Sequence, residues 1–348
     1  MIFENYQNVK RHSTLNKNQY SYPVILLIML FLLLMADIAI GSVWIPLGDV
    51  FQILIGGTPQ KAAWSTIIWD FRLPRVLSAV LVGSALSISG LLMQTLFRNP
   101  IAGPYVLGIS SGASLGVAIL LLSGGFSLMS IFGQWALVGV SALGAGLVLF
   151  LMMLMAWRVK DIVTLLIVGL MLGSVTSAVV TILEYFSGLQ QLKMFVLWSF
   201  GSLTRITWTE FYVLFIITIT GLSGSFLMIK SLNALLIGEE YAKSMGLKIM
   251  PVRYATIGIT ALLAGSVTAF CGPIAFIGIA VPHLARMIFQ TQNHRILIPM
   301  TILLGAVIML VCDLVAQLPT FEQTLPINAV TSLIGAPVVI WIVIRRKY

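Results

Sequence analysis

Residues 76–122 have the sequence VLSAVLVGSALSISGLLMQTLFRNPIAGPYVLGISSGASLGVAILLL, an apolar stretch that decides the fold. A helix rises about 1.5 Å per residue, so about 20 apolar residues cross a bilayer core of about 30 Å. The stretch is therefore long enough for two membrane spans. The segment 98–104, RNPIAGP, separates them, because proline and glycine interrupt helices.

The rest of the chain has the same character. Of its 348 residues 59% are hydrophobic and 9% charged, whereas an average globular chain has about 25% charged residues. A second break, at 271–273, divides another long apolar stretch. Residues 1–22 form a polar tail without a signal-cleavage pattern, and 23–348 form a single transmembrane domain. The sequence predicts an all-α polytopic membrane protein with about ten spans, at 23–44, 76–97, 104–122, 134–157, 162–185, 209–229, 252–270, 274–290, 296–316 and 327–344.

The lysine and arginine residues predict the orientation, since they accumulate on the cytoplasmic side of inner-membrane proteins. With ten spans and a cytoplasmic start, fifteen of the 20 fall inside, and the other five fall outside: Lys61, Arg72, Arg75, Lys193 and Arg205. Removing the eighth span would move the basic residues 345–347 outside, so the bias favours ten spans with both termini in the cytoplasm. The net charge of +9 comes from scattered residues, so we expect no nucleic-acid partner.

Few residues offer enzyme or metal chemistry. Cys271 and Cys312 lie in apolar surroundings without metal-ligand or disulfide spacing, so we expect no metal site. No phosphate-binding loop of the GxxxxGK[ST] type is present, so we expect the chain neither to hydrolyse ATP nor to bind a cofactor. We assign no catalytic residue. One enzymatic alternative stays open, because GISSG at 108–112 fits a nucleophile elbow and Ser110 with His283 would suit an intramembrane serine protease.

A gradient-driven secondary transporter is a second alternative. Such proteins hold ionisable residues near the middle of the bilayer, often beside broken helices. Here Asp37, Glu184 and Asp313 fall near the outer ends of spans, and His283 and Arg286 near an inner end. This distribution favours a transporter that takes its energy from another protein.

The inner loop between the sixth and seventh spans has the character of a docking element. Its segment 235–246, LLIGEEYAKSMG, predicts a short helix with Glu239 and Glu240 in the first turn, where carboxylates favour the positive end of the helix dipole. Gly238 precedes this helix, and Gly246 is placed to cap its C-terminus.

One face of this short helix is suited to a partner. Ala242 and Met245 would lie one turn apart and form a compact, adaptable surface for a partner's groove. The alternative is an amphipathic connector that only contacts solvent.

Two arginines stand three positions apart in the outer segment 69–75, WDFRLPR. Arginine binds carboxylates bidentately and is favoured at interfaces. Arg72 and Arg75 could therefore receive an acidic partner at the outer face. Contact with lipid headgroups is the alternative.

Several stretches, in this order along the chain, resemble the FecCD-type permease subunits of type II ABC importers for iron-siderophores, haem and cobalamin. Each match is weak alone, but the ordered set is specific to the family. The matching stretches are RLPRV at 72–76, LVGSALSISG at 81–90, the segment 94–107, GISSGA at 108–113, WSFGS at 198–202 with Trp208, GEEYA at 238–242 with Met245 and Gly246, GPIAFIG at 272–278, VPHLAR at 281–286, then His294, Arg295, Asp313 and LIGAP at 333–337.

The resemblance implies a homodimer of ten-helix subunits in a bacterial inner membrane, with the transport path between the two copies. Two ATPase subunits, which hold ATP and Mg²⁺, would lie below the dimer, and a periplasmic or lipid-anchored substrate-binding protein above it. The resemblance also assigns roles to three sets of residues: ATPase coupling to Gly238, Glu239, Glu240, Ala242, Met245 and Gly246, docking of the binding protein to Arg72 and Arg75, and the cytoplasmic gate to Asn99 and Ile101.

The chain departs from the family pattern in two places. The family often has an arginine after the Asp-x-x-Ala of the ninth span, where this chain has Gln317, so docking is expected to depend more on Arg72 and Arg75. The inner turn between spans four and five has Ile162 and Val163, where the cobalamin importer has small hydroxyl residues in a gate. Because iron-siderophores are the most frequent cargo of the family that the chain resembles, the expected substrate is an iron-siderophore or a related metal chelate, moved by alternating access, with haem and cobalamin next.

Overall fold

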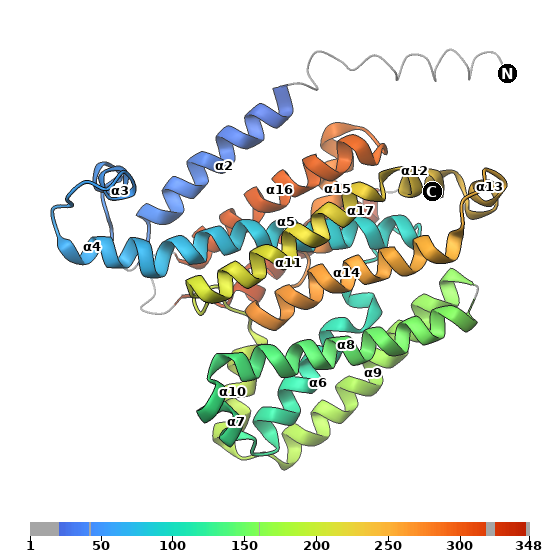
Figure 1. The fold of residues 1–348 in the computed structure, drawn as a ribbon, viewed down its shortest axis with the longest axis horizontal. Helices are drawn as coiled ribbons and strands as arrows, with labels where there is room; N and C mark the ends of the chain where they lie inside the picture. Colours follow the sequence, from blue (N-terminus) through green and yellow to red (C-terminus); the bar gives the residue numbers. More distant parts are fainter. Residues whose placement is uncertain (1–20, 42, 160, 318–323, 346–348) are drawn as a thin grey trace.

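The computed structural model describes residues 21–41, 43–159, 161–317 and 324–345, which form helices and connections without a strand (Figure 1). Among these residues, seven helices are long and apolar enough to cross a membrane, and three shorter apolar helices accompany them. The seven are α2 (Ser21–Ala39), the continuous helix Ala62–Leu96, α8 (Gln134–Arg158), α9 (Ile162–Phe186), α11 (Trp208–Leu227), α14 (Ile249–Cys271) and α16 (His294–Ala316). The three are α6 (Ile109–Leu122), α15 (Ile277–Phe289) and α17 (Ile327–Arg345). Together these helices agree with the expected number of about ten spans.

The second span begins earlier than expected, at Ala62 rather than at residue 76. It consists of α4 (Ala62–Thr66), the π-helical segment η2 (Ile67–Arg72) and α5 (Leu73–Leu96) without a gap. Its 35 residues correspond to about 50 Å of helix, well beyond a bilayer core of about 30 Å. The expected outer loop before residue 76 is therefore partly a helical extension of the span.

Both expected breaks are confirmed. After α5, Arg98 has a φ of +47°, and the chain passes through the short 3-10 helix η3 (Pro104–Leu107) before α6. After α14, Gly272 has a φ of +75°, a conformation that costs glycine little. α15 then begins at Ile277, five positions after Gly272.

α5 is the central helix, and 89% of the most apolar window of its span is buried. Figure 1 shows α2, α16, α11 and α14 around it, while α6, α8 and α9 form a separate layer below α14. Glycines allow the closest approaches: a Cβ on Gly83 would collide with the Gly305 carbonyl in α16, and one on Gly90 with the Gly278 carbonyl in α15.

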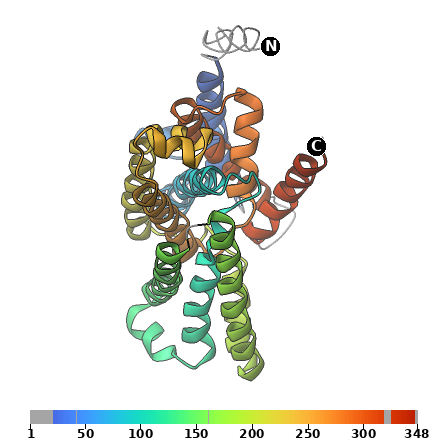
Figure 2. The ribbon, with the colours of Figure 1, turned by 90° about the vertical axis from the view of Figure 1, so that its right-hand side faces the viewer.

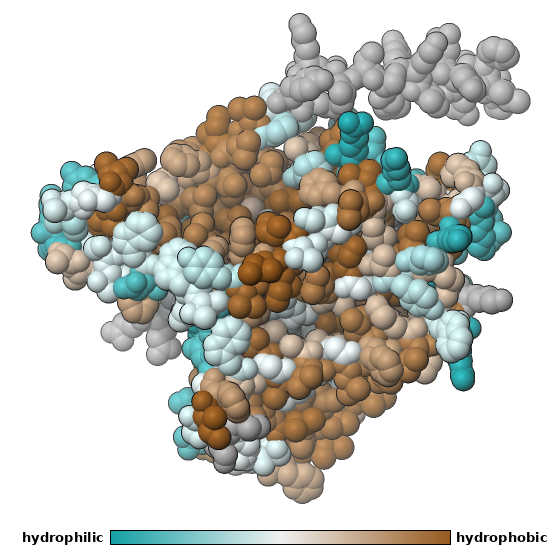
Figure 3. Space-filling view, in the orientation of Figure 1, coloured by the Kyte–Doolittle hydropathy of each residue, from teal (hydrophilic) through white to brown (hydrophobic). Residues whose placement is uncertain are grey.

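The molecule has two polar ends separated by an apolar belt (Figure 3). One end, called the inner end below, carries α12 (Ile229–Ile237) and α13 (Glu239–Ser244), and Figure 2 looks at it. The opposite, outer end carries α3 (Leu47–Leu54) and α10 (Leu189–Ser199). α2 begins and α17 ends on the side of α12 and α13, as an even number of spans requires (Figure 1).

Candidate functional site

The short helix α13 at the inner end is set apart from its neighbours by a glycine at each end. Gly238 has a φ of +137° and Gly246 a φ of +87°, values that favour glycine. The Leu247 N–H donates to the Ala242 carbonyl at 3.0 Å and closes the last turn. The expected helix, with two glutamates in its first turn and a glycine after its end, is confirmed.

α13 exposes a different face from the expected one. Ala242 is 0% exposed and packs against the core of its own chain, so the expectation that it faces a partner together with Met245 is wrong. Tyr241 and Met245 are 59% and 53% exposed. They stand four positions apart and therefore share one face of the helix.

Glu239 attaches α13 to α14. Its Oε1 lies 3.3 Å from Nη2 of Arg253, whose side chain is only 2% exposed, and Nη1 of the same arginine donates to the Val159 carbonyl at 3.2 Å. Glu240, in contrast, pairs with Lys243 in solvent. The sequence does not indicate this role of Arg253, because Arg253 lies within a span and nothing in its spacing joins it to α13.

The expected gate turn directly follows α5. Asn99 Oδ1 accepts a hydrogen bond from the Ile101 N–H at 3.1 Å, which fixes the turn, and Ile101 is 47% exposed. Nη2 of Arg98 donates to the Leu235 carbonyl in α12 at 2.9 Å. The turn is therefore bonded to the helix that leads into α13, a contact that the sequence did not indicate.

A buried polar chain joins α5, α12 and α16 close to this turn. Nε2 of the fully buried His294 lies 2.9 Å from Oγ1 of Thr95, and its Nδ1 lies 2.9 Å from Oδ1 of Asn233. Nδ2 of Asn233 donates to Asn293, which fixes the amide orientation. Because an amide oxygen only accepts, Nδ1 carries the proton, and the single hydroxyl hydrogen of Thr95 is shared between Nε2 and the Leu91 carbonyl, which lies 2.9 Å away. These bonds hold α12 against α5 and α16.

The inner turn between α8 and α9 ends in a cap. Asp161 Oδ2 accepts hydrogen bonds from the N–H and the hydroxyl of Thr164 at 2.7 and 2.6 Å. These bonds, the hydroxyl first, lower the pKa of the Asp161 carboxyl below its ordinary value. Ile162 begins α9, and Val163 is 60% exposed, so the two residues that depart from the family pattern stand in its first turn.

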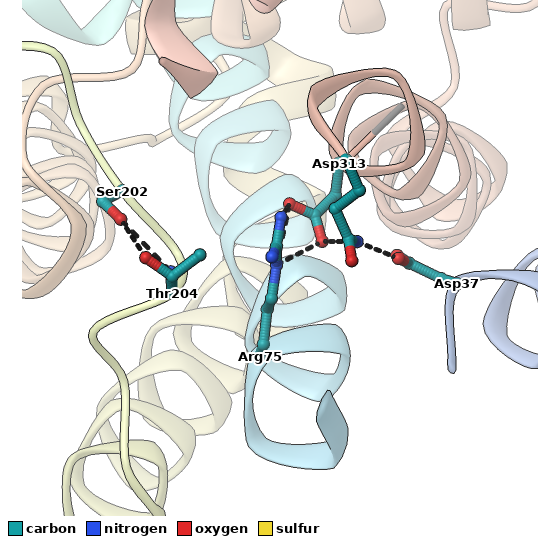
Figure 4. A network of polar contacts seen from close by, with 6 residues as sticks. Asp37, Arg75, Ser202, Thr204 and Asp313 are labelled. Atoms are coloured by element: carbon teal, nitrogen blue, oxygen red, sulfur yellow. Dashed lines mark hydrogen bonds and ion pairs between the residues drawn. The ribbon is translucent and has the colours of Figure 1, made fainter. Parts of the chain in front are cut away.

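Arg75 forms a buried bidentate ion pair with Asp313 at the outer end (Figure 4). Its Nη2 and Nε lie 2.8 and 2.9 Å from the two carboxylate oxygens of Asp313, with the side chains 12% and 1% exposed. Nε2 of Gln317 donates to the same carboxylate at 3.1 Å and also to Oδ1 of Asp37 in α2. Gln317 thus connects two buried carboxylates on different helices.

Arg72 is also used within the chain. It is 7% exposed, and it donates to the carbonyls of Ile38 and Ala39 at 2.6 and 2.9 Å and to that of Val43. Both arginines are thus bound within the chain, and docking of a binding protein to Arg72 and Arg75 stays a prediction. Carbonyl groups at and just after the end of α2 bind Nη1 and Nη2 of Arg72, and the carboxylate of Asp313 binds Nε and Nη2 of Arg75.

Neither catalytic nor metal chemistry is assembled in the described part of the chain. His283 lines a pocket at the inner end, and Ser110, which follows the first residue of α6, is not among its lining residues. No strand precedes Ser110 in these residues, so the context of a nucleophile elbow is missing. Cys271 and Cys312 are buried free thiols, and no group of three or more metal-binding side chains occurs among the residues described.

Comparisons with known proteins agree with this architecture. The profile of the FecCD transport family matches residues 26–345. The vitamin B12 import system permease protein BtuC of Klebsiella pneumoniae is 35% identical over 322 residues, which cover 92% of this chain and 93% of the relative. The hemin transport system permease protein HmuU of Yersinia pestis is 35% identical over 326 residues, with 92% and 95% covered. A solved inward-facing conformation described as a metal-chelate type ABC transporter matches with a TM-score of 0.81 at 29% identity and covers 93% of this chain and 99% of that one.

Proposed function

The chain belongs to the FecCD transport family, and from this premise we propose that it is the ABC-importer permease for an iron-siderophore or a related metal chelate in a bacterial inner membrane. The match over 93% of the chain to a metal-chelate type transporter supports this cargo. Two copies would enclose the path, with two ABC ATPase subunits at the inner end and a substrate-binding protein at the outer end. The ATPase subunits would hold ATP and Mg²⁺, since this chain has no phosphate-binding loop.

The observation that carries the mechanism is the set of contacts that joins α13 to the helices behind it. Glu239 connects α13 to α14, and Arg98 connects the gate turn to α12. His294 connects α12 to α5 and α16. A partner that moves the exposed face of α13 would therefore displace α14 and the gate turn together. Alternating access requires such a concerted movement.

Purification of the tagged chain from its native membrane, followed by quantitative mass spectrometry, tests the assembly. We expect an ABC ATPase subunit at equal stoichiometry with the permease. A chain that purifies alone, even with candidate ATPase subunits co-expressed, would contradict the proposal. Uptake that needs an ion gradient but no ATP would instead favour a secondary transporter.

Cobalamin and haem are the second candidates for the cargo, because BtuC and HmuU are named for vitamin B12 and hemin import. The binding protein that accompanies the complex can be loaded with a ferric siderophore, haem or cobalamin in turn. ATP-dependent uptake into proteoliposomes is then measured for each. We expect uptake of the ferric siderophore, and uptake of cobalamin or haem alone would refute the proposed cargo.

A further inference from the structure

A pocket of about 470 Å³ opens at the inner end between α5, α12 and α15. Its lining includes Arg98, Arg286, His283 and Gln94, and none of the lining residues that the structure describes is acidic. The cavity is therefore strongly basic. One of the coupling contacts described above, the bond of Arg98 to the Leu235 carbonyl, involves a residue of its lining.

Arg286 is more buried than Arg98, the other arginine of the pocket lining. It stands in the last turn of α15 and is half-buried, and its Nη1 donates to Oε1 of Gln94. Nε2 of the same glutamine donates to the Ile279 carbonyl at 3.0 Å, so the amide oxygen is fixed toward the guanidinium. A guanidinium has five N–H donors, and among the described residues Gln94 is its hydrogen-bond partner. Most of its donors are thus available to a ligand.

Among the described residues, no carboxylate pairs with Arg286 to compensate its positive charge. The neutral amide of Gln94 does not cancel a positive charge, and the pocket lining supplies no carboxylate. The carbonyl groups at the C-terminal end of α15 favour a cation there, but a helix terminus carries only about half a negative charge and does not neutralise a guanidinium. Removing a charge from water without a counter-charge is unfavourable, so an anion in this pocket would stabilise the arrangement.

Arg98, in the turn that follows α5, is a second basic residue of the pocket lining. One of its nitrogen atoms is bound to the Leu235 carbonyl, which holds the exposed guanidinium at the rim of the pocket. An anion between Arg98 and Arg286 would therefore touch both the gate turn and α15. Arginine binds phosphate groups bidentately, and basic pockets between membrane helices on the cytoplasmic side bind anionic lipid headgroups.

We propose that this pocket binds the phosphate group of an anionic phospholipid, held by Arg286 and Arg98. The surface beside the pocket suits the acyl chains, because Met287 and Ile288 of α15 are 37% and 43% exposed and apolar. Met287 itself belongs to the lining, so the basic pocket continues directly into an apolar surface. Free phosphate would use the same arginines but not these apolar neighbours. The site needs only the membrane fold and is independent of the proposed cargo.

Lipid titration of the delipidated full chain in neutral detergent, followed by native mass spectrometry, tests the site. Phosphatidylglycerol should bind at least about tenfold more tightly than phosphatidylcholine. Arg286→Gln should weaken phosphatidylglycerol binding by about tenfold, the loss expected for charge-assisted hydrogen bonds. Inorganic phosphate is titrated as a separate arm. Binding of inorganic phosphate without binding of phosphatidylglycerol would overturn the lipid as the source of the anion.

Arg295→Gln is the matched control, since Arg295 is an exposed arginine of the same end that does not line the pocket. It should leave the affinity for phosphatidylglycerol unchanged. Equal losses in Arg286→Gln and Arg295→Gln would overturn the proposal, because they would indicate general surface charge. If Arg286→Gln does not fold, Arg98→Gln decides: a weakened affinity supports the site, and an unchanged affinity overturns it.

Discussion

Glu239→Gln tests how firmly α13 is attached. The change keeps the size of the side chain but removes its charge, so Arg253, which is 2% exposed, loses its carboxylate partner. Hydrogen bonds to charged groups contribute about 1.5–3 kcal/mol, and a Glu239 side chain that is 27% exposed places this one in the lower part of that range. We therefore expect the free energy of opening of α13 to fall by about 1.5–2 kcal/mol. Since roughly 1.4 kcal/mol changes an equilibrium constant tenfold, the open state of α13 should be populated about ten to thirty times more often.

Hydrogen exchange followed by mass spectrometry measures this opening in the amides of 239–246. Their protection should fall by about ten- to thirtyfold, whereas the amides of α5 should keep theirs. Glu240→Gln is the control, because Glu240 is 89% exposed and its pair with Lys243 is a surface pair, which contributes about 0–1 kcal/mol. Equal protection in the two variants would refute the attachment through Arg253. In the assembled importer, Glu239→Gln should also transport less substrate per ATP than Glu240→Gln does.

Three further predictions concern the rest of the chain. Gly90→Ala should destabilise the protein by about 1–3 kcal/mol, since its methyl group would collide with the backbone of α15; thermal unfolding checks this against Gly139→Ala, where nothing lies within 4 Å and no loss is expected. Arg72→Gln should speed proteolysis between α2 and α3, because it removes the hydrogen bonds that hold the end of α2, and an unchanged digestion rate would contradict that role. The pKa of Asp161 is lowered in the folded chain, so the ionised Asp161 cap should stabilise the start of α9 at pH values above the ordinary pKa of 3.8. This stabilisation should be lost as the pH falls through the lowered pKa. Hydrogen exchange of the first α9 amides should therefore become faster at low pH in the parent chain, and the Asp161→Ala variant should lack this pH dependence.

The sequence predicted the ten spans because each is a local property. Apolar length determines a span, and the breaks at 98–104 and 271–273 depend on residues that interrupt a helix wherever they occur. The sequence predicts too late a start for the second span, because Arg72 and Arg75 have the character of charges outside the membrane. Their partners lie 34 and 238 positions away along the chain, and no local pattern connects them.

The same limit applies to the inner end. The caps of α13 were predictable because they depend on neighbouring residues such as Gly246. Which face of α13 is buried depends instead on where α14 lies, so the burial of Ala242 was not predictable. The role of Arg253 was not predictable either, because it is an isolated charge within an apolar helix. Only the folded chain identifies Glu239 as its partner.

The ion pairs at the two ends of the molecule differ in strength, and this difference affects how the transporter moves. At the outer end, Arg75 and Asp313 share two short hydrogen bonds of 2.8 and 2.9 Å, and a glutamine extends this cluster to α2. At the inner end, Glu239 and Arg253 share a single contact of 3.3 Å. A buried bidentate pair costs more to separate than one long contact at a half-open site. A force applied at α13 should therefore displace the inner end of α14 and the gate turn, while the outer cluster keeps the outer ends of α2, α5 and α16 together.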